Sequence, residues 1–274
     1  MIVDAHCHAW ERWPYQPPVP DFEQRGRVEQ LLWEMDRNGV DRAVVICAGI
    51  DHNPDNNAYV AACAAAHPDR LVQFADVDSR WTPTYHAPGA ADRLAAVLER
   101  WPLKGFTHYV EREPDGWFAS DEGVRLFSLA AERGLIASIA APPAWQPALR
   151  ELARRFPTMP ILCHHLAGVR AGDPEGLREV LRSASVPSIA IKVSGFYYAS
   201  ATDWDFPFSD VHHIVRALYE HFGPRRLCWG SDYPVVRRAT TYRQALEAVR
   251  AHCPFIPAPD MEWVLGGNLN TLLT

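Results

Sequence analysis

IVDAHCHAW, residues 2–10, is a short apolar segment that carries two histidines two positions apart near its end. It opens the first of eight segments rich in β-forming residues, and stretches with helical periodicity separate these segments from one another. The eight segments are Ile2–His8, Arg42–Gly49, Val72–Asp78, Leu103–Val110, Ile136–Pro142, Pro160–Gly168, Ile189–Tyr198 and Arg226–Val235. Strands that alternate with helices in this way predict parallel strands joined by right-handed crossovers.

The helical stretches carry apolar residues at i, i+3, i+4 and i+7. Residues 28–35 follow this spacing and Gly39 supplies the stop; residues 145–156, 211–222 and 242–249 repeat it. Eight strands in 274 residues favour a (β/α)8 TIM barrel, whose usual size is about 250 residues. A doubly wound sheet is less favoured, because no glycine-rich phosphate loop follows the first strand. We therefore predict one domain over residues 1–274, with long excursions at Trp13–Asp21 and around Trp81–Gly89.

Composition restricts the partners and the compartment. A net charge of −6 gives no reason to expect nucleic acid or an anionic membrane as a partner, and no run of 18 apolar residues predicts a membrane span. The first strand begins at residue 2, which leaves no room for a signal peptide. The six cysteines are scattered, mostly in apolar runs, and predict buried free thiols. We expect a cytoplasmic protein that acts on a small molecule, with a homodimer allowed.

Active sites of such barrels lie at the C-terminal ends of the strands. Alternation of strand side chains predicts that Ile2, Asp4, His6 and His8 point the same way. Other strand ends also carry polar side chains: Asp76, Asp78, His108, His164, His165, Lys192, Ser194 and Asp232.

Asp232 ends an apolar strand, and an unpaired buried carboxylate is costly, so a cation, a histidine or a hydrogen-bond donor should face it. We predict that His6, His8 and one of the pair His164 and His165 converge on it. Neutral imidazoles and a carboxylate suit a divalent transition metal such as zinc, and the carboxylate alone suits a general base. A pair of satisfied buried histidines is the alternative for His6 and His8.

Several motifs resemble those of the amidohydrolase superfamily, over the whole chain. DAHCHAW (4–10) is similar to its His-x-His motif and WGSDYP (229–234) to its strand-eight aspartate motif. HHLAG (164–168), KVSGF (192–196) and LGGNLNTLL (265–273) resemble the amidohydrolase-related branch, which includes 2-pyrone-4,6-dicarboxylate lactonase, sugar-acid lactonases and metal-dependent decarboxylases of aromatic acids.

The resemblance implies roles for four residues. His6, His8 and His165 match the active-site histidines of the branch, and Asp232 matches the aspartate that deprotonates water. His165 is preferred to His164 because the lactonase motif reads Asp-His-Leu-Gly and His165 holds the histidine place.

The chain also departs from many metal-dependent members. IASIAAPP (136–143) offers neither histidine nor carboxylate on the fifth strand, and Lys104 lies at the wrong end of its strand to bridge two metals. A two-metal centre is therefore not expected. A one-metal site, with zinc or manganese, would use His6, His8, His165 and Asp232 as its ligands; members of the lactonase branch also hydrolyse without a metal, so both states stay open.

The sequence also predicts orientations or substrate-binding roles for other polar residues near the strand ends. Lys192 is predicted to point inward and to pair with Asp76 or Asp78. His164 is predicted to face away from the barrel axis. Four residues are candidates for substrate binding, with exposed loop positions as the alternative for Arg112: His108, Tyr109, Arg112 and Tyr197.

The predicted function is hydrolysis of a cyclic ester or a related carbonyl compound. Asp232 would activate water, and His6, His8 and His165, or a metal that they bind, would stabilise the oxyanion. The first alternative is a metal-dependent non-oxidative decarboxylase of an aromatic or unsaturated acid. The second is a barrel that binds a ligand without catalysis.

Overall fold

The structure is a computed structural model that describes residues 1–12, 25–51 and 53–274. The excursion predicted at residues 13–21 therefore lies outside the described residues.

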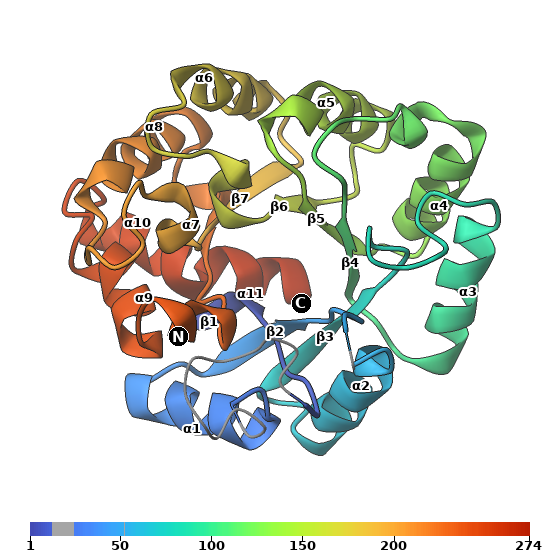
Figure 1. Cartoon of the computed structure of the whole chain (residues 1–274), viewed down its shortest axis with the longest axis horizontal. Helices are drawn as coiled ribbons and strands as arrows, with labels where there is room; N and C mark the ends of the chain where they lie inside the picture. Colours follow the sequence, from blue (N-terminus) through green and yellow to red (C-terminus); the bar gives the residue numbers. More distant parts are fainter. Residues whose placement is uncertain (13–24, 52) are drawn as a thin grey trace.

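Eight parallel strands form a ring, which is the predicted (β/α)8 architecture (Figure 1). Each strand pairs with the next in chain order: β1 Val3–Cys7, β2 Arg42–Ile46, β3 Leu71–Asp76, β4 Gly105–Tyr109, β5 Ile136–Ala140, β6 Ile161–Cys163, β7 Ile189–Val193 and β8 Leu227–Trp229. The segment after β8 closes the ring against β1, because the His8 backbone N–H donates to the Tyr233 carbonyl at 2.8 Å and the Asp232 N–H donates to the His6 carbonyl at 3.1 Å.

The predicted strand segments overrun the observed strands at their C-terminal ends. The largest differences are at Pro160–Gly168, where β6 ends at Cys163, and at Arg226–Val235, where β8 ends at Trp229. After Cys163 the backbone turns left-handed, with φ of +47° at His165, +53° at Leu166 and +54° at Ala167. A left-handed backbone cannot continue a strand, so the apolar composition of this stretch misled the prediction.

Helices surround the ring (Figure 1). They are α1 Val28–Asn38, α2 Asn56–Ala66, α3 Ala90–Arg100, α4 Asp121–Glu132, α5 Gln146–Arg155, α6 Pro174–Arg182, α7 Phe196–Ala199, α8 His212–Phe222, α9 Tyr242–Arg250, α10 Ala258–Glu262 and α11 Asn268–Leu273. The four helices expected from periodicity are confirmed as α1, α5, α8 and α9. Gly39 ends α1 with φ +67°, a conformation that glycine adopts without strain.

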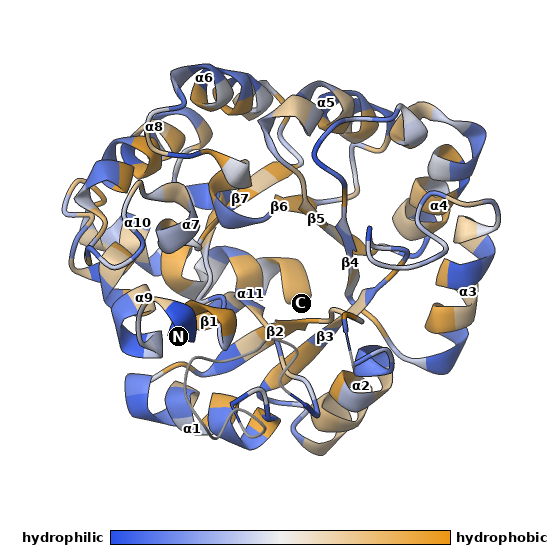
Figure 2. Ribbon diagram, in the orientation of Figure 1, coloured by the Kyte–Doolittle hydropathy of each residue, from blue (hydrophilic) through white to orange (hydrophobic). Residues whose placement is uncertain are grey.

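Buried apolar side chains fill two regions. One lies between strands and helices, and Figure 2 shows the hydrophobic strands β2 and β3 beside helices of mixed hydropathy. The other fills the inside of the ring and contains Val44, Phe74, Ile136 and Leu162 together with Leu269 and Leu273 of α11. The backbone at Gly266, just before α11, lies against the start of β1, so α11 covers the N-terminal end of the barrel and leaves the C-terminal ends of the strands for a site.

Two predictions from composition agree with the structure. All six cysteines are free and buried. Among the described residues, no helix is both long enough and apolar enough to cross a membrane.

Candidate active site

An irregularity in β1 aims His6 into the barrel. Pairing with β2 shifts register between Asp4 and Cys7, and Val3 and Ala5 belong to the inner apolar group. The Asp4 carboxylate accepts from Tyr242 of α9 at 3.2 Å, so the prediction that Asp4 and His6 point the same way is wrong. An irregularity of this kind re-aims side chains next to active sites.

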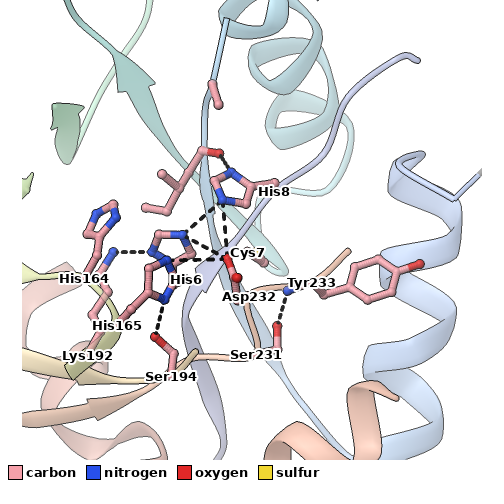
Figure 3. A network of polar contacts seen from close by, with 12 residues as sticks. His6, Cys7, His8, His164, His165, Lys192, Ser194, Ser231, Asp232 and Tyr233 are labelled. Carbon is pink, nitrogen blue, oxygen red and sulfur yellow. Dashed lines mark hydrogen bonds and ion pairs between the residues drawn. The ribbon is translucent and has the colours of Figure 1, made fainter. Parts of the chain in front are cut away.

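Three histidine Nε2 atoms surround one carboxylate oxygen (Figure 3). Asp232 Oδ1 lies 3.5 Å from His6 Nε2, 3.7 Å from His8 Nε2 and 3.7 Å from His165 Nε2. The Nε2 atoms of His6 and His8 are 3.0 Å apart. The structure thus brings together the four residues that the sequence placed at one end of the barrel.

Asp232 is held in a left-handed turn, with φ +57°, and is 1% exposed. Its Oδ2 accepts a hydrogen bond from the Tyr197 hydroxyl at 2.8 Å. Burial raises the pKa of Asp232 to about 7, although hydrogen bonds from Tyr197 and Tyr198 oppose the increase. The carboxyl group therefore gains and loses its proton close to neutral pH.

His8 has a defined tautomer. Its Nδ1 contacts the backbone carbonyl oxygen of Ile46, which only accepts, so Nδ1 carries the hydrogen. Burial lowers the pKa of His8 to about 3, and the ring is therefore neutral with a lone pair on Nε2. His8 can bind a metal or accept a hydrogen bond through Nε2, but in this tautomer it cannot donate to an oxyanion.

Lys192 is fully buried and points inward as predicted, but the predicted ion pair is wrong. Its Nζ lies 2.9 Å from His6 Nδ1 and 2.6 Å from Ser138 Oγ. Burial lowers the pKa of Lys192 to about 7, so the ammonium and the neutral amine are both accessible near neutrality.

The two aspartates expected to pair with Lys192 are engaged elsewhere. Asp76 accepts from the Trp81 indole at 2.8 Å and from Ser79. Asp78 adopts φ +50° and accepts from Arg93 of α3 at 2.9 Å. This turn directs both carboxylates toward the loop after β3 and away from Lys192.

His164 was predicted to face away from the axis, and this prediction is also wrong. Its ring lies 4.3 Å from the His6 ring, and its Nε2 lies 2.7 Å from Ser138 Oγ. His164 is still extended, with φ −71° and ψ 148°, and lies two positions after Leu162 of the inner group, so alternation places it inward. The left-handed turn begins at His165 and brings that side chain to the site as well. His165 Nδ1 lies 3.0 Å from Ser194 Oγ.

Two sets of three residues offer ligand atoms within 4.8 Å of one another: His6, His8 and Asp232, and His6, His164 and His165. Ligand atoms held tetrahedrally at zinc distances of 2.0–2.2 Å lie about 3.3–3.6 Å apart. The separations of 3.0, 3.5 and 3.7 Å within the first set are close to that range. This donor set therefore fits one divalent transition metal.

A cavity of about 670 Å³ adjoins the site. It is lined by Arg112, Glu113, Ala140, Ala141, Pro142, Pro143, Ala144, His164, His165, Gly168, Val169, Arg170, Asp173, Tyr198 and Ala199. Of the four residues predicted to bind substrate, Arg112 is among these lining residues.

The other three predicted substrate-binding residues lie elsewhere. Tyr197 binds Asp232, and the Tyr109 ring packs edge-on against His164 at 5.0 Å. His108 is 1% exposed, with Nδ1 2.9 Å from the Val77 carbonyl oxygen. A role of these residues in substrate binding stays a prediction.

The sequence analysis missed Ser138 and Arg170 as parts of the site, whereas it named Ser194 as a polar strand end. The sequence did carry a signal for Ser138, because it is a polar side chain inside an apolar strand, two positions from the inward-facing Ile136. Arg170 lies in a loop after β6, where a single sequence gives no direction for a side chain.

Known proteins resemble the chain along most of its length. L-fucono-1,5-lactonase from Burkholderia ambifaria is 26% identical, over 97% of this chain and 93% of the relative. Among solved structures, an amidohydrolase from Burkholderia multivorans with bound zinc superposes with a TM-score of 0.79 at 20% identity, covering 100% of this chain and 99% of the other. A probable 2-pyrone-4,6-dicarboxylic acid hydrolase from Acinetobacter baumannii with bound citric acid gives 0.77 at 19% identity, covering 99% and 98%.

At such identities the structural likeness concerns the fold alone, which decarboxylases of 5-carboxyvanillate and 2,6-dihydroxybenzoate also share. The amino-acid sequence shows the family as well as the fold. The sequence model of the amidohydrolase family matches residues 3–269, and the chain therefore belongs to the amidohydrolase family.

Proposed function

We propose that the protein is a lactonase, a hydrolase that opens a small cyclic ester. The observation that carries this proposal is the buried Asp232 carboxylate, surrounded by three histidine Nε2 atoms beside a cavity of about 670 Å³. The lactonase relative that aligns with nearly the whole chain supports it.

Asp232 is the proposed general base. A base is most effective when its pKa lies near the working pH, and burial brings the pKa of Asp232 to about 7. Oδ1 would take a proton from water while the water oxygen attacks the lactone carbonyl. When the ring C–O bond breaks, the same carboxylic acid would return the proton to the leaving alkoxide.

His6 and His165 are the proposed oxyanion donors. A Lys192 ammonium donates to His6 Nδ1, so the ring hydrogen then lies on Nε2, which faces Asp232. His165 Nε2 faces the same oxygen when Nδ1 accepts from Ser194. Preorganised donors of this kind stabilise the charge that develops on the carbonyl oxygen.

His6, His8 and Asp232, with His165 at the same carboxylate, are the residues that would hold a zinc or manganese ion. Such an ion would supply Lewis-acid polarisation of the carbonyl. Its ligation at His6 Nε2 requires that Nδ1 carry the hydrogen and that Lys192 accept it as the neutral amine.

Replacement of Asp232 by asparagine tests the proposal. D232N keeps the shape of the side chain, and we expect kcat for lactone hydrolysis to fall by about 10²- to 10⁴-fold because the base is lost. Circular dichroism and Tm check that the variant is folded, and D260N on the outer helix α10 is the matched control. A D232N rate within about threefold of wild type contradicts the assignment of the base.

The decarboxylase alternative is separated by its products. The protein is assayed with a panel of lactones by proton release and with aromatic carboxylic acids by CO2 release. We expect proton release that stops when the lactone is consumed. CO2 release without lactone hydrolysis contradicts the proposed lactonase, and so does binding of a lactone without turnover.

A further inference from the structure

The junction where the ring of strands closes, between β1 and residues 230–233, carries site residues on both of its sides. His6 lies on β1 and Asp232 follows β8. Consecutive strands form ladders from β1 to β8, whereas within the described part of the chain this junction shows only one isolated bridge, between Cys7 and Tyr233. The junction therefore needs other contacts to fix the separation of His6 Nε2 and Asp232 Oδ1, which is 3.5 Å.

The Asp4 carboxylate lies at this junction and binds both of its sides. Its Oδ1 accepts from the backbone N–H of His6 at 2.9 Å and from the backbone N–H of Ser231 at 3.2 Å. Its Oδ2 accepts from the Ser231 hydroxyl at 2.7 Å and from the Tyr242 hydroxyl at 3.2 Å. One side chain thus holds the backbone of His6 and that of the residue immediately before Asp232.

The bond from the His6 N–H to Asp4 also stabilises the irregularity of β1. A carboxylate that accepts from the backbone N–H two residues further on competes with strand pairing. Pairing of β1 with β2 does shift register between Asp4 and Cys7, the stretch in which this bond lies. Because such an irregularity re-aims a side chain, Asp4 contributes to the direction of the His6 ring as well as to its place.

Asp4 can influence the site only through other residues. Its side chain is 0% exposed, and it is not one of the residues that line the cavity of about 670 Å³. The four hydrogen bonds to its carboxylate come from uncharged donors, two N–H groups and two hydroxyls. A buried charge is costly, but two acceptor oxygens on one short side chain can bind two segments at once.

We propose that Asp4 is a positioning residue, whose carboxylate holds His6 and Asp232 at the separation that hydrolysis requires. This inference rests on the proposed lactonase function and adds a support for its two central residues. The shape of the carboxylate matters here, because Oδ1 faces two N–H groups that can only donate, whereas Oδ2 faces hydroxyls that can donate or accept.

D4N and D4E separate the shape of this side chain from its charge. In D4N the amide oxygen can replace Oδ1, and the amide nitrogen can replace Oδ2 because both hydroxyls there can accept. D4E keeps the charge, but its additional methylene displaces the carboxylate from the two N–H groups. S231A and Y242F are a second matched pair: each removes one hydroxyl that donates to Oδ2, and only Ser231 lies at the junction.

We expect D4E to lower kcat for lactone hydrolysis by about 10²-fold, the effect of a misplacement near 1 Å, with KM within about threefold because the cavity wall is unchanged. D4N should restore kcat to within about threefold of wild type, with its acid limb displaced by less than about one pH unit. S231A should lower kcat by at least about threefold more than Y242F does. Circular dichroism and Tm show which variants are folded.

Three kinetic results overturn the proposal: a folded D4N that is as slow as D4E, a D4E that turns over at the wild-type rate, and equal kcat in S231A and Y242F. The first would mean that Asp4 acts through its charge. If D4E does not fold, D4N and the pair S231A and Y242F still decide the question.

Crystal structures of the variants give a result that does not depend on turnover. The separation of His6 Nε2 and Asp232 Oδ1, 3.5 Å in the wild type, should persist in D4N and lengthen in D4E, or in S231A where D4E does not fold. An unchanged separation in the displaced variant overturns the inference whatever the substrate. A wild type that hydrolyses no lactone of the panel refutes the lactonase function instead, and these separations still decide the role of Asp4.

Discussion

Replacement of Tyr197 by phenylalanine should move the pH at which the protein becomes active. The Tyr197 hydroxyl donates to Asp232 Oδ2 at 2.8 Å, inside a buried site. This bond stabilises the ionised carboxylate, and a hydrogen bond to a charged group contributes about 1.5–3 kcal/mol. Its loss therefore raises the pKa of Asp232 by about 1–2 units above the value of about 7.

The direction of the effect follows from the role of the ionised base. Below the pKa of Asp232 the active fraction falls tenfold per pH unit, so Y197F should lose about 10- to 100-fold in kcat/KM at pH 6 and recover toward wild type above pH 9. The assay is kcat/KM for a lactone from pH 5 to pH 10, with the uncatalysed hydrolysis subtracted. Y219F is the matched control, because its hydroxyl donates to Asp260 on the outer helices. A Y197F profile whose acid limb coincides with that of wild type, or lies at lower pH, refutes the reasoning.

Three further predictions address the surroundings of Asp232. Added Zn²⁺ should raise the Tm of wild type but not of H8A, because binding at 100 times Kd stabilises by about 2.7 kcal/mol; equal shifts in both proteins place the metal elsewhere. G230A should lower kcat by at least about tenfold, because its Cβ would lie 2.9 Å from the Cβ of His6 and would displace the His6 ring. A wild-type rate for G230A would show that the ring tolerates the shift. K192M should keep or raise Tm, because it removes a buried charge, while kcat/KM falls as His6 loses its partner; unchanged kinetics would make Lys192 purely structural.

The sequence predicts the barrel well because each strand and helix carries its own signal. The periodic residues of α1 and α8, each followed by a glycine, define helices without reference to the rest of the chain. The expectation that His6, His8 and Asp232 meet follows from the same local patterns, since strand ends converge at one end of a barrel.

The errors occur where the backbone leaves regular geometry. His165 reaches the site beside His164 because a left-handed turn begins at His165, and Asp4 faces α9 because β1 is irregular. Lys192 pairs with His6 and Ser138 rather than with an aspartate, because Trp81 and Ser79 bind Asp76 and Arg93 binds Asp78. None of these backbone conformations has a signature in residue type, so alternation alone cannot predict them.

The left-handed run after β6 also bears on efforts to engineer a more durable catalyst. Leu166 and Ala167 occupy a conformation that costs about 1–2 kcal/mol for a residue with a side chain, and glycine would remove that cost. The same change would loosen the segment that holds His164 and His165 against the barrel. Leu166 is fully buried, however, and loss of its side chain would cost about 2–5 kcal/mol, more than the strain that glycine removes. A selection for heat resistance would therefore keep leucine at this position, and the strained turn would persist with it.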